Sequence, residues 1–240
     1  MFRIEHEGEI ARLVLDRPEA RNAIPLRGWA SLADAIDEIG RSAARLMLLS
    51  GAGGAFCAGA DLGELAKLRE DDVARVSFRK DMRRALNAIR ALEIPAIAWI
   101  DGPCYGAGVA LAMACDLRIA APSSNFAITP AKIGISYPQE DVHRLIELVG
   151  SGQASRLLFT ALSIDAAEAH RIGLVELLAE EVVSVADAVL ANAGESLQAL
   201  KQSIRLAQEG CRQDDRIDRR FDELMAGETL TGRLEALRRK

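Results

Sequence analysis

The hydrophobic residues of the chain fall into short runs that predict strands and helices in alternation. Residues 2–6 and 10–15 predict two short strands, because apolar side chains are concentrated in each and a glycine separates them. Residues 25–40 carry apolar side chains at helical spacing, and Gly40 ends that pattern. The apolar run 46–49 then predicts a buried strand, which leads into a glycine-rich segment.

The same order of elements recurs further along the chain. Residues 96–100 predict another strand, and a second glycine-rich segment, a helix and a strand at 116–121 follow it. Such alternation predicts an α/β layered fold with largely parallel strands. From residue 182 onward the pattern is helical only. We therefore expect a core over residues 1–181 and a C-terminal helical oligomerisation segment over residues 182–240.

Composition and charge narrow the classes of function. The chain has 240 residues, half of them hydrophobic, which is enough to bury a sizeable core. Its net charge of −5 argues against non-specific nucleic-acid binding. The four cysteines form no C-x-x-C pair and there are three histidines, so neither a metal site nor a disulfide framework is expected. The N-terminus does not resemble a signal peptide, and no apolar run approaches the roughly 18 residues that span a membrane. A cytoplasmic protein without membrane contact is the expectation.

Two glycine-rich turns carry the candidate chemistry. Residues 51–62 follow one predicted strand and residues 102–108 follow another, and each leads into a helical pattern. Glycine permits positive φ and close approach of the backbone to a ligand, and a helix N-terminus presents unpaired N–H donors. Two such turns side by side can aim two donors at one developing oxyanion. Glycine-rich turns are also common as simple connections in α/β folds, and these two match neither a P-loop nor a dinucleotide fingerprint.

Four segments together resemble the signatures of a known family. They are residues 15–23, 51–62, 101–121 and 166–175. The chain is identified on these motifs as resembling the crotonase (enoyl-CoA hydratase/isomerase) family from residue 2 to about residue 240. The resemblance implies an α/β fold, a crotonase-type spiral of ββα units with a C-terminal helical trimerisation region. It also implies an acyl-CoA thioester substrate, no prosthetic group, and a homotrimer or a hexamer built as a dimer of trimers.

The resemblance assigns roles to particular positions. The oxyanion donors would be the backbone N–H groups of Ala60 and Ala107, where the family usually has glycine at the second position. Contacts to CoA carry over to Glu19, Ala20, Arg21, Ala58 and Ala60. Arg21 is a reasonable partner for a CoA phosphate, or else a solvated charge in a loop. The basic tail from Arg238 to Lys240 matches a region that can reach a neighbouring subunit's CoA, or is simply a basic helix end.

The chain departs from the family where hydratases hold two glutamates. The matching positions are Ala110 and Pro130, and neither side chain transfers a proton. Because water addition needs general acid–base help, a conventional hydratase is disfavoured. The loop acid of isomerases matches Pro138, but Glu140 and Asp141 follow, as a catalytic acid or as carboxylates that open the next helix. In the first turn, Asp61 and Glu64 resemble a helix-capping pair.

Residues 126–137 are similar to the methylmalonyl-CoA decarboxylase branch of the family. That branch has Thr-Pro where hydratases have Pro-Glu, and a tyrosine at the position of Tyr137, which would orient the substrate carboxylate, return a proton or simply pack. It keeps a glutamate where this chain has Ala110. Three hypotheses stay open: a decarboxylating lyase, a hydratase or isomerase that uses Glu140 or Asp141, and an acyl-CoA-binding protein without catalysis.

Overall fold

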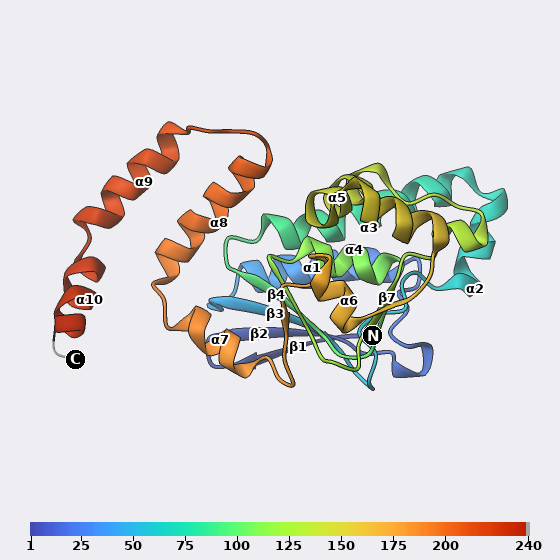
Figure 1. The fold of residues 1–240 in the computed structure, drawn as a ribbon, viewed down its shortest axis with the longest axis horizontal. Coiled ribbons are helices and arrows are strands. Elements are labelled where there is room, and N and C mark those ends of the chain that lie inside the picture. Colours follow the sequence, from blue (N-terminus) through green and yellow to red (C-terminus); the bar gives the residue numbers. More distant parts are fainter. Residues whose placement is uncertain (239–240) are drawn as a thin grey trace.

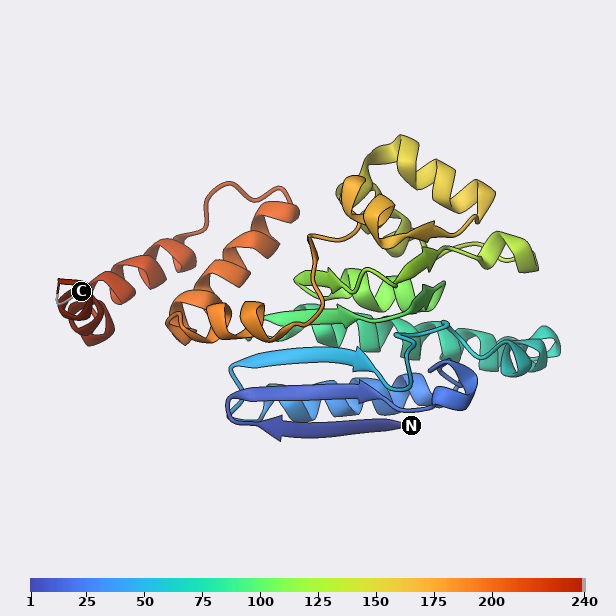
Figure 2. The same cartoon turned by 60° about the horizontal axis from the view of Figure 1, so that its bottom comes forward.

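The main sheet of the computed structural model, which describes residues 1–238, contains six strands within that range. The first two pair antiparallel and the other neighbours pair in parallel. In spatial order the strands are β1 (Phe2–Glu7), β2 (Ile10–Leu15), β3 (Leu46–Gly51), β4 (Ala96–Ile100), β6 (Leu117–Ala120) and β9 (Leu177–Leu178). Figure 2 shows β1, β2 and β3, in blue, lying side by side with the helix α1 behind them. The predicted strands and their largely parallel arrangement are confirmed.

A smaller sheet lies beside the main one. It contains β5 (Pro103–Tyr105), β7 (Asn125–Ala127) and β8 (Ile164–Asp165), with β5 parallel and β8 antiparallel to β7. The sequence predicted one continuous turn where β5 lies. That prediction was wrong because a three-residue strand has no readable period, and β5 forms through its ladder with β7.

Helices cover both faces of the main sheet. On one face, α1 and α3 pack against each other, and the helical face expected over residues 25–40 is buried. The bounds are α1 (Gly28–Gly40), α2 (Leu62–Leu65), α3 (Asp72–Ala91), α4 (Ala107–Ala114), α5 (Gln139–Thr160) and α6 (Ala166–Arg171), with 3₁₀ turns η1 (Pro18–Ala20), η2 (Ala66–Glu70) and η3 (Pro130–Ile133). Because Met47 and Leu49 face this layer while Leu46 and Leu48 face the other, β3 is buried on both sides.

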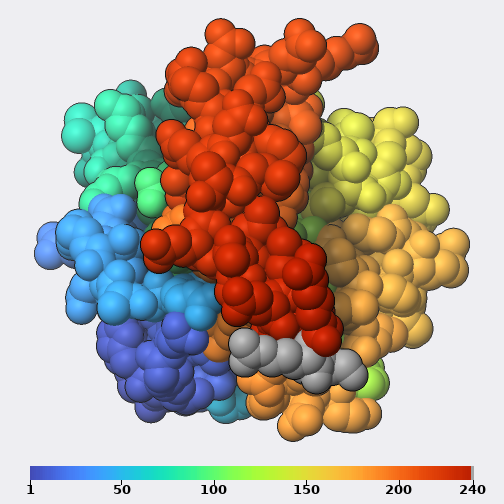
Figure 3. All heavy atoms as spheres, turned by 90° about the vertical axis from the view of Figure 1, so that its left-hand side faces the viewer, coloured from blue at the N-terminus to red at the C-terminus, as the bar shows by residue number. Residues whose placement is uncertain are grey.

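The C-terminal part of the described chain consists of helices. They are α7 (Val183–Leu190), α8 (Gly194–Gln208), α9 (Asp215–Ala226) and α10 (Glu228–Arg238). The last two residues of the basic tail, 239–240, lie outside the described residues. In Figure 1, α8, α9 and α10 form an arm at the opposite end of the molecule from α2, and Figure 3 views this arm from its outer side. We call α8 to α10 the helical arm.

A buried lysine joins the helical arm to the body. Lys201 is 6% exposed, and its ammonium group donates to the Asp116 carboxylate at 2.7 Å and to the Ile94 carbonyl at 2.8 Å. Large apolar side chains on the arm remain exposed: Leu200, Ile204, Phe221, Met225, Leu234 and Leu237. Within residues 1–238, no helix has the length and apolar character needed to cross a membrane.

Candidate active site

The two glycine-rich turns meet at one edge of the main sheet. They follow β3 and β4, which are parallel neighbours, so both turns leave the sheet at the same edge. An isolated parallel bridge joins Cys57 in the first turn to Cys104 in the second. Its hydrogen bonds run from the Cys57 N–H to the Pro103 carbonyl at 3.1 Å and from the Tyr105 N–H to the Cys57 carbonyl at 2.8 Å. The backbones of the two turns are therefore fixed relative to each other.

The N–H groups of Ala60 and Ala107 have no hydrogen-bond acceptor among residues 1–238. At Ala60, the neighbouring Gly59 carbonyl and Asp61 N–H both bond to Ile24, at 2.8 and 2.9 Å, so the Ala60 N–H points to the opposite side. Ala107 is the first residue of α4, where a helical N–H has no intrahelical partner. A Cβ atom placed on Gly59 would lie 3.1 Å from the Ala107 nitrogen. The two free amides thus belong to backbone segments that touch.

The backbone before Ala107 explains why alanine fits the second position. Gly106 has φ 52° and ψ −117°, which places it in the region that favours glycine. Ala107 is not among the non-glycine residues with positive φ. The chain therefore makes its sharp turn at Gly106, and Ala107 keeps an N–H without backbone strain.

The residues matched to CoA contacts also lie together. Glu19 and Ala20 belong to η1, and Arg21 follows in a left-handed conformation with φ 49°. The Ala58 N–H donates to the Arg21 carbonyl at 2.9 Å, which joins this loop to the first glycine-rich turn. The Arg21 side chain is exposed and its guanidinium has no ion-pair partner within the described part of the chain. It is free to meet an anionic ligand.

Asn22 holds this loop in place, and the sequence reasoning gave it no role. It is 2% exposed, and its amide group donates to the carbonyls of Ala52 and Ala55 at 2.9 and 2.7 Å. Its side-chain oxygen accepts the Arg17 N–H at 2.8 Å. An asparagine in a polar loop can be noticed in the sequence as a candidate for side-chain to backbone hydrogen bonds. The carbonyls that its amide group contacts lie about 30 residues later, so local sequence spacing does not predict them.

Both candidate acids, Asp141 and Glu140, form ion pairs with Arg83. Asp141 is 6% exposed, and its carboxylate accepts two hydrogen bonds from Arg83 of α3, at 3.1 and 3.0 Å. Glu140 is exposed and contacts the same guanidinium at 2.9 Å. Both lie in the first turn of α5, as the helix-opening alternative expected. Burial raises the pKa of Asp141, and Arg83 opposes that shift. Sequence reasoning missed Arg83, because no spacing connects α3 with α5.

Tyr137 lies under the second turn. Its side chain is buried, and its hydroxyl donates to the Gly106 carbonyl at 3.0 Å. Burial raises the pKa of this hydroxyl well above its usual value. Ala110 is 3% exposed within α4, and Pro130 begins η3. Beside the second turn, the positions of the two hydratase glutamates therefore carry side chains without a titratable group, while the hydroxyls of Tyr137 and Thr129 lie close to Gly106.

The expected cap in the first turn is confirmed for Asp61, whereas Glu64 bonds to Leu26 instead of the Asp61 N–H. The Asp61 carboxylate accepts the N–H groups of Gly63 and Glu64 at 2.9 and 3.3 Å and begins α2. The guanidinium of Arg17 bonds to the other oxygen at 2.6 Å and lowers the pKa of Asp61. The Glu64 carboxylate accepts the Leu26 N–H at 2.7 Å. Both acids are thus engaged in holding the turn.

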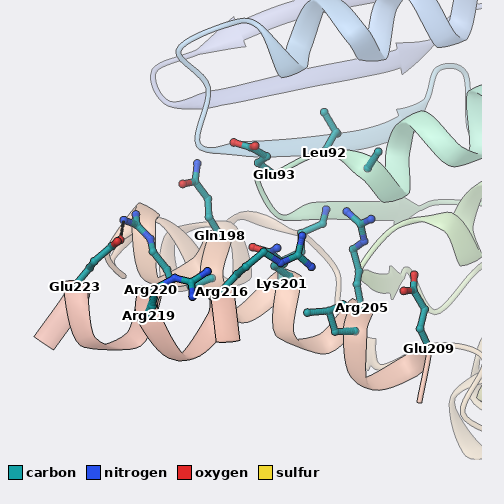
Figure 4. Close-up of a pocket in the computed structure, with 14 residues that line it drawn as sticks. Leu92, Glu93, Gln198, Lys201, Arg205, Glu209, Arg216, Arg219, Arg220 and Glu223 are labelled. Atoms are coloured by element: carbon teal, nitrogen blue, oxygen red, sulfur yellow. Dashed lines mark hydrogen bonds and ion pairs between the residues drawn. The ribbon is translucent and has the colours of Figure 1, made fainter. Parts of the chain in front are cut away.

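A cavity lies at the other end of the molecule, between the helical arm and the end of α3. It has a volume of about 650 Å³, and Figure 4 shows Lys201, Arg205 and Arg216 among its lining residues. Its lining comes from the arm and from residues 91–93, and it contains none of the residues matched to the acyl-CoA site.

The family comparison agrees with this geometry. A family model described as enoyl-CoA hydratase/isomerase matches residues 5–230. The chain belongs to the enoyl-CoA hydratase/isomerase family. It is 35% identical over 224 residues to a crotonyl-CoA hydratase of Syntrophomonas wolfei, covering 90% of this chain and 84% of that protein. It is 34% identical over 177 residues to an enoyl-CoA isomerase/hydratase of Mycosarcoma maydis, covering 70% of this chain and 64% of that protein.

Solved structures extend the match to the whole fold. An enoyl-CoA hydratase/isomerase family protein from Hyphomonas neptunium superimposes with a TM-score of 0.93 at 33% identity, covering 98% of this chain and 94% of the other. The predicted crotonase fold, with ββα units followed by C-terminal helices, is confirmed. Family membership implies an acyl-CoA substrate for this enoyl-CoA hydratase/isomerase family enzyme.

Proposed function

We propose that this chain binds an acyl-CoA thioester with its carbonyl oxygen between the N–H groups of Ala60 and Ala107, and stabilises the enolate formed there. The observation that carries the proposal is that both amides lack an acceptor within residues 1–238 and lie on touching segments. One preorganised donor of this kind is worth about 2.7–4 kcal/mol in a transition state. Ala110 and Tyr137 are buried beside the second turn, and hydrogen bonds to a charge are stronger where water is excluded.

The CoA part of the ligand is proposed to lie along the loop that precedes α1. Arg21 supplies an unpaired guanidinium suited to a phosphate; Ala20 precedes it in η1, and the Ala58 N–H bonds to its carbonyl. Glu19 lies at the outer edge, where its carboxylate is 3.6 Å from the Arg17 guanidinium. This placement runs from the surface loop toward the two free amides.

We propose decarboxylation of a malonyl-type thioester, as in the methylmalonyl-CoA decarboxylase branch, as the reaction. The bond between the α-carbon and the carboxylate carbon breaks, CO₂ leaves, and the electron pair becomes the enolate held by the two amides. A proton from solvent water then returns to the α-carbon. No base is required, which suits Ala110 and Pro130 at the positions of the hydratase glutamates. An apolar environment for the departing carboxylate also favours its loss.

One observation favours a second candidate, double-bond isomerisation. Asp141 is buried, and burial raises its pKa, which is the direction expected of a catalytic base. Its two bonds to Arg83 argue for a structural role instead. Glu140 is exposed and shares the same arginine, so it is the weaker of the two candidate bases.

Three thioesters separate the hypotheses. The purified protein is incubated with methylmalonyl-CoA, crotonyl-CoA and a 3-enoyl-CoA, and CO₂ release, hydration and double-bond migration are followed. CO₂ release that persists in Asp141→Asn and Glu140→Gln supports the lyase. Migration that is lost in Asp141→Asn, in protein that remains folded by circular dichroism, supports the isomerase. Tight binding of all three without turnover supports a non-catalytic acyl-CoA-binding protein.

We also propose that copies of this chain assemble through the helical arm, as a trimer or a dimer of trimers. The arm leaves six large apolar side chains exposed along its helices, more than isolated surface residues would explain. In a closed trimer each copy contacts the next through two different faces, so the apolar arm of one copy would pack on another surface of its neighbour. Sedimentation of the intact protein and of Phe221→Asp tests this; a mass that is monomeric in both would reject it.

A further inference from the structure

The buried Tyr137 hydroxyl bonds to the peptide unit that carries the second oxyanion donor. The Gly106 carbonyl and the Ala107 N–H are the two ends of one planar peptide group. Tyr137 donates to that carbonyl oxygen at 3.0 Å, while the N–H at the opposite end has no acceptor among the described residues. The hydroxyl proton of Tyr137 is thus already committed to the backbone.

Other donors point at the same carbonyl oxygen. The N–H groups of Val109 and Ala110 reach the Gly106 oxygen at 3.0 and 3.4 Å. The N–H of Gly106 itself donates to the Ala127 carbonyl at 2.8 Å, which fixes the preceding peptide. Hydrogen bonds that share a peptide polarise it, and each is worth roughly a 10–30% strengthening of the next. A peptide whose oxygen accepts several bonds therefore has a more strongly donating N–H.

We infer that Tyr137 is a positioning residue that fixes and polarises the Gly106–Ala107 peptide, so that the Ala107 N–H becomes a stronger oxyanion donor. This rests on the proposed function and assigns Tyr137 a role through the backbone rather than in proton transfer to the substrate. Because burial raises the pKa of the Tyr137 hydroxyl well above its usual value, the hydroxyl stays protonated and keeps donating at neutral pH.

The experiment measures polarisation of a bound thioester. Butyryl-CoA with ¹³C at the thioester carbonyl is the probe, since a saturated chain without an extra carboxylate offers none of the three candidate reactions. The infrared band of that carbonyl is recorded free, bound to the unaltered protein, and bound to Tyr137→Phe. The matched control is Tyr105→Phe, because Tyr105 is in the same turn but its hydroxyl bonds to the Asn125 side chain.

We expect the downshift of the bound carbonyl band to shrink in Tyr137→Phe and to be kept in Tyr105→Phe. With whichever thioester is turned over, we expect kcat to fall about fivefold to tenfold in Tyr137→Phe, with KM changed by less than about twofold. Replacing Tyr137 with 3-fluorotyrosine keeps the shape of the ring and makes the hydroxyl a stronger donor, so the downshift is expected to grow. This second variant keeps the inference testable if the phenylalanine variant does not fold.

The outcomes distinguish this inference from the proposed function. An unaltered protein that binds the probe without any carbonyl downshift would overturn the oxyanion assignment and the inference together. A full downshift in Tyr137→Phe, or no response to 3-fluorotyrosine, overturns the inference alone. An equal loss in Tyr137→Phe and Tyr105→Phe also overturns it, because general loosening of the turn would then explain both.

Discussion

Replacing Ala107 with proline removes one proposed oxyanion donor and is expected to leave the fold intact. Proline is well tolerated at the first position of a helix, where its missing N–H has no intrahelical partner. The residue before a proline must avoid the α region. Gly106, at φ 52° and ψ −117°, meets that requirement because these angles are the mirror image of an extended conformation. The substitution therefore replaces the donor hydrogen of Ala107 with the Cδ methylene of the proline ring and is expected to leave the start of α4 in place.

The expected loss follows from the value of a single donor. Removing one oxyanion-hole donor costs about 2.7–4 kcal/mol, which corresponds to a fall in kcat of about 10²–10³. The loop around Arg21 is unchanged, so affinity for the CoA portion is expected to stay within about threefold. A large loss of turnover with retained CoA affinity separates this effect from unfolding.

The assay compares Ala107→Pro with Asp215→Pro. Asp215 is the exposed first residue of α9 and also follows an extended residue, so it receives the same backbone change far from the glycine-rich turns. Turnover, CoA affinity by calorimetry and the thermal midpoint are measured for both variants. If Ala107→Pro turned over substrate within about threefold of the unaltered protein, the Ala107 amide would not be an oxyanion donor.

Three further predictions concern stability and thiol chemistry. Arg17 lowers the pKa of Asp61, so the ionised carboxylate adds stability above the unfolded-state pKa, and this stability is lost as the pH falls through the folded-state pKa. Thermal scans should therefore show that the difference in thermal midpoint between Arg17→Leu and the unaltered protein closes below about pH 4. Lys201→Met should lower the free energy of unfolding in urea by about 1–3 kcal/mol, since it removes two bonds that anchor the helical arm, and an unchanged midpoint would contradict that anchor. In the folded protein a thiol reagent should modify Cys211 first, because burial raises the pKa of Cys57 to about 12; equal rates for the two would refute this.

The sequence predicted the fold well where a period or a motif was long enough to read. The helical face around Trp29 and the continuous apolar run of β3 each carry a clear pattern, and both elements are where they were expected. Short elements such as β5 gave no signal, because three residues acquire a strand conformation only through a distant partner. Placement of the glycine-rich turns at one sheet edge followed from the parallel order of their strands.

The candidate site was less predictable from sequence. The free amides at Ala60 and Ala107 were expected from the resemblance, but their lack of acceptors depends on the bridge at Ile24 and on the start of α4. The contacts of Tyr137 and Asp141 could not be predicted, since each depends on side-chain direction between distant elements. Sequence reasoning named the residues, while their partners required the fold.

The proposed donors at positions 60 and 107 belong to the main chain. Nearly every amino acid supplies the same N–H group, so point mutations around these turns leave enolate stabilisation available unless they introduce proline or disturb a required glycine. Side chains such as those at positions 110 and 130 can then be exchanged during evolution without losing this shared step. A scaffold of this kind can acquire a new reaction when the side chains that transfer the proton or contact the leaving group are replaced. The main-chain donors for the enolate, the least stable species on the path, are kept through each replacement.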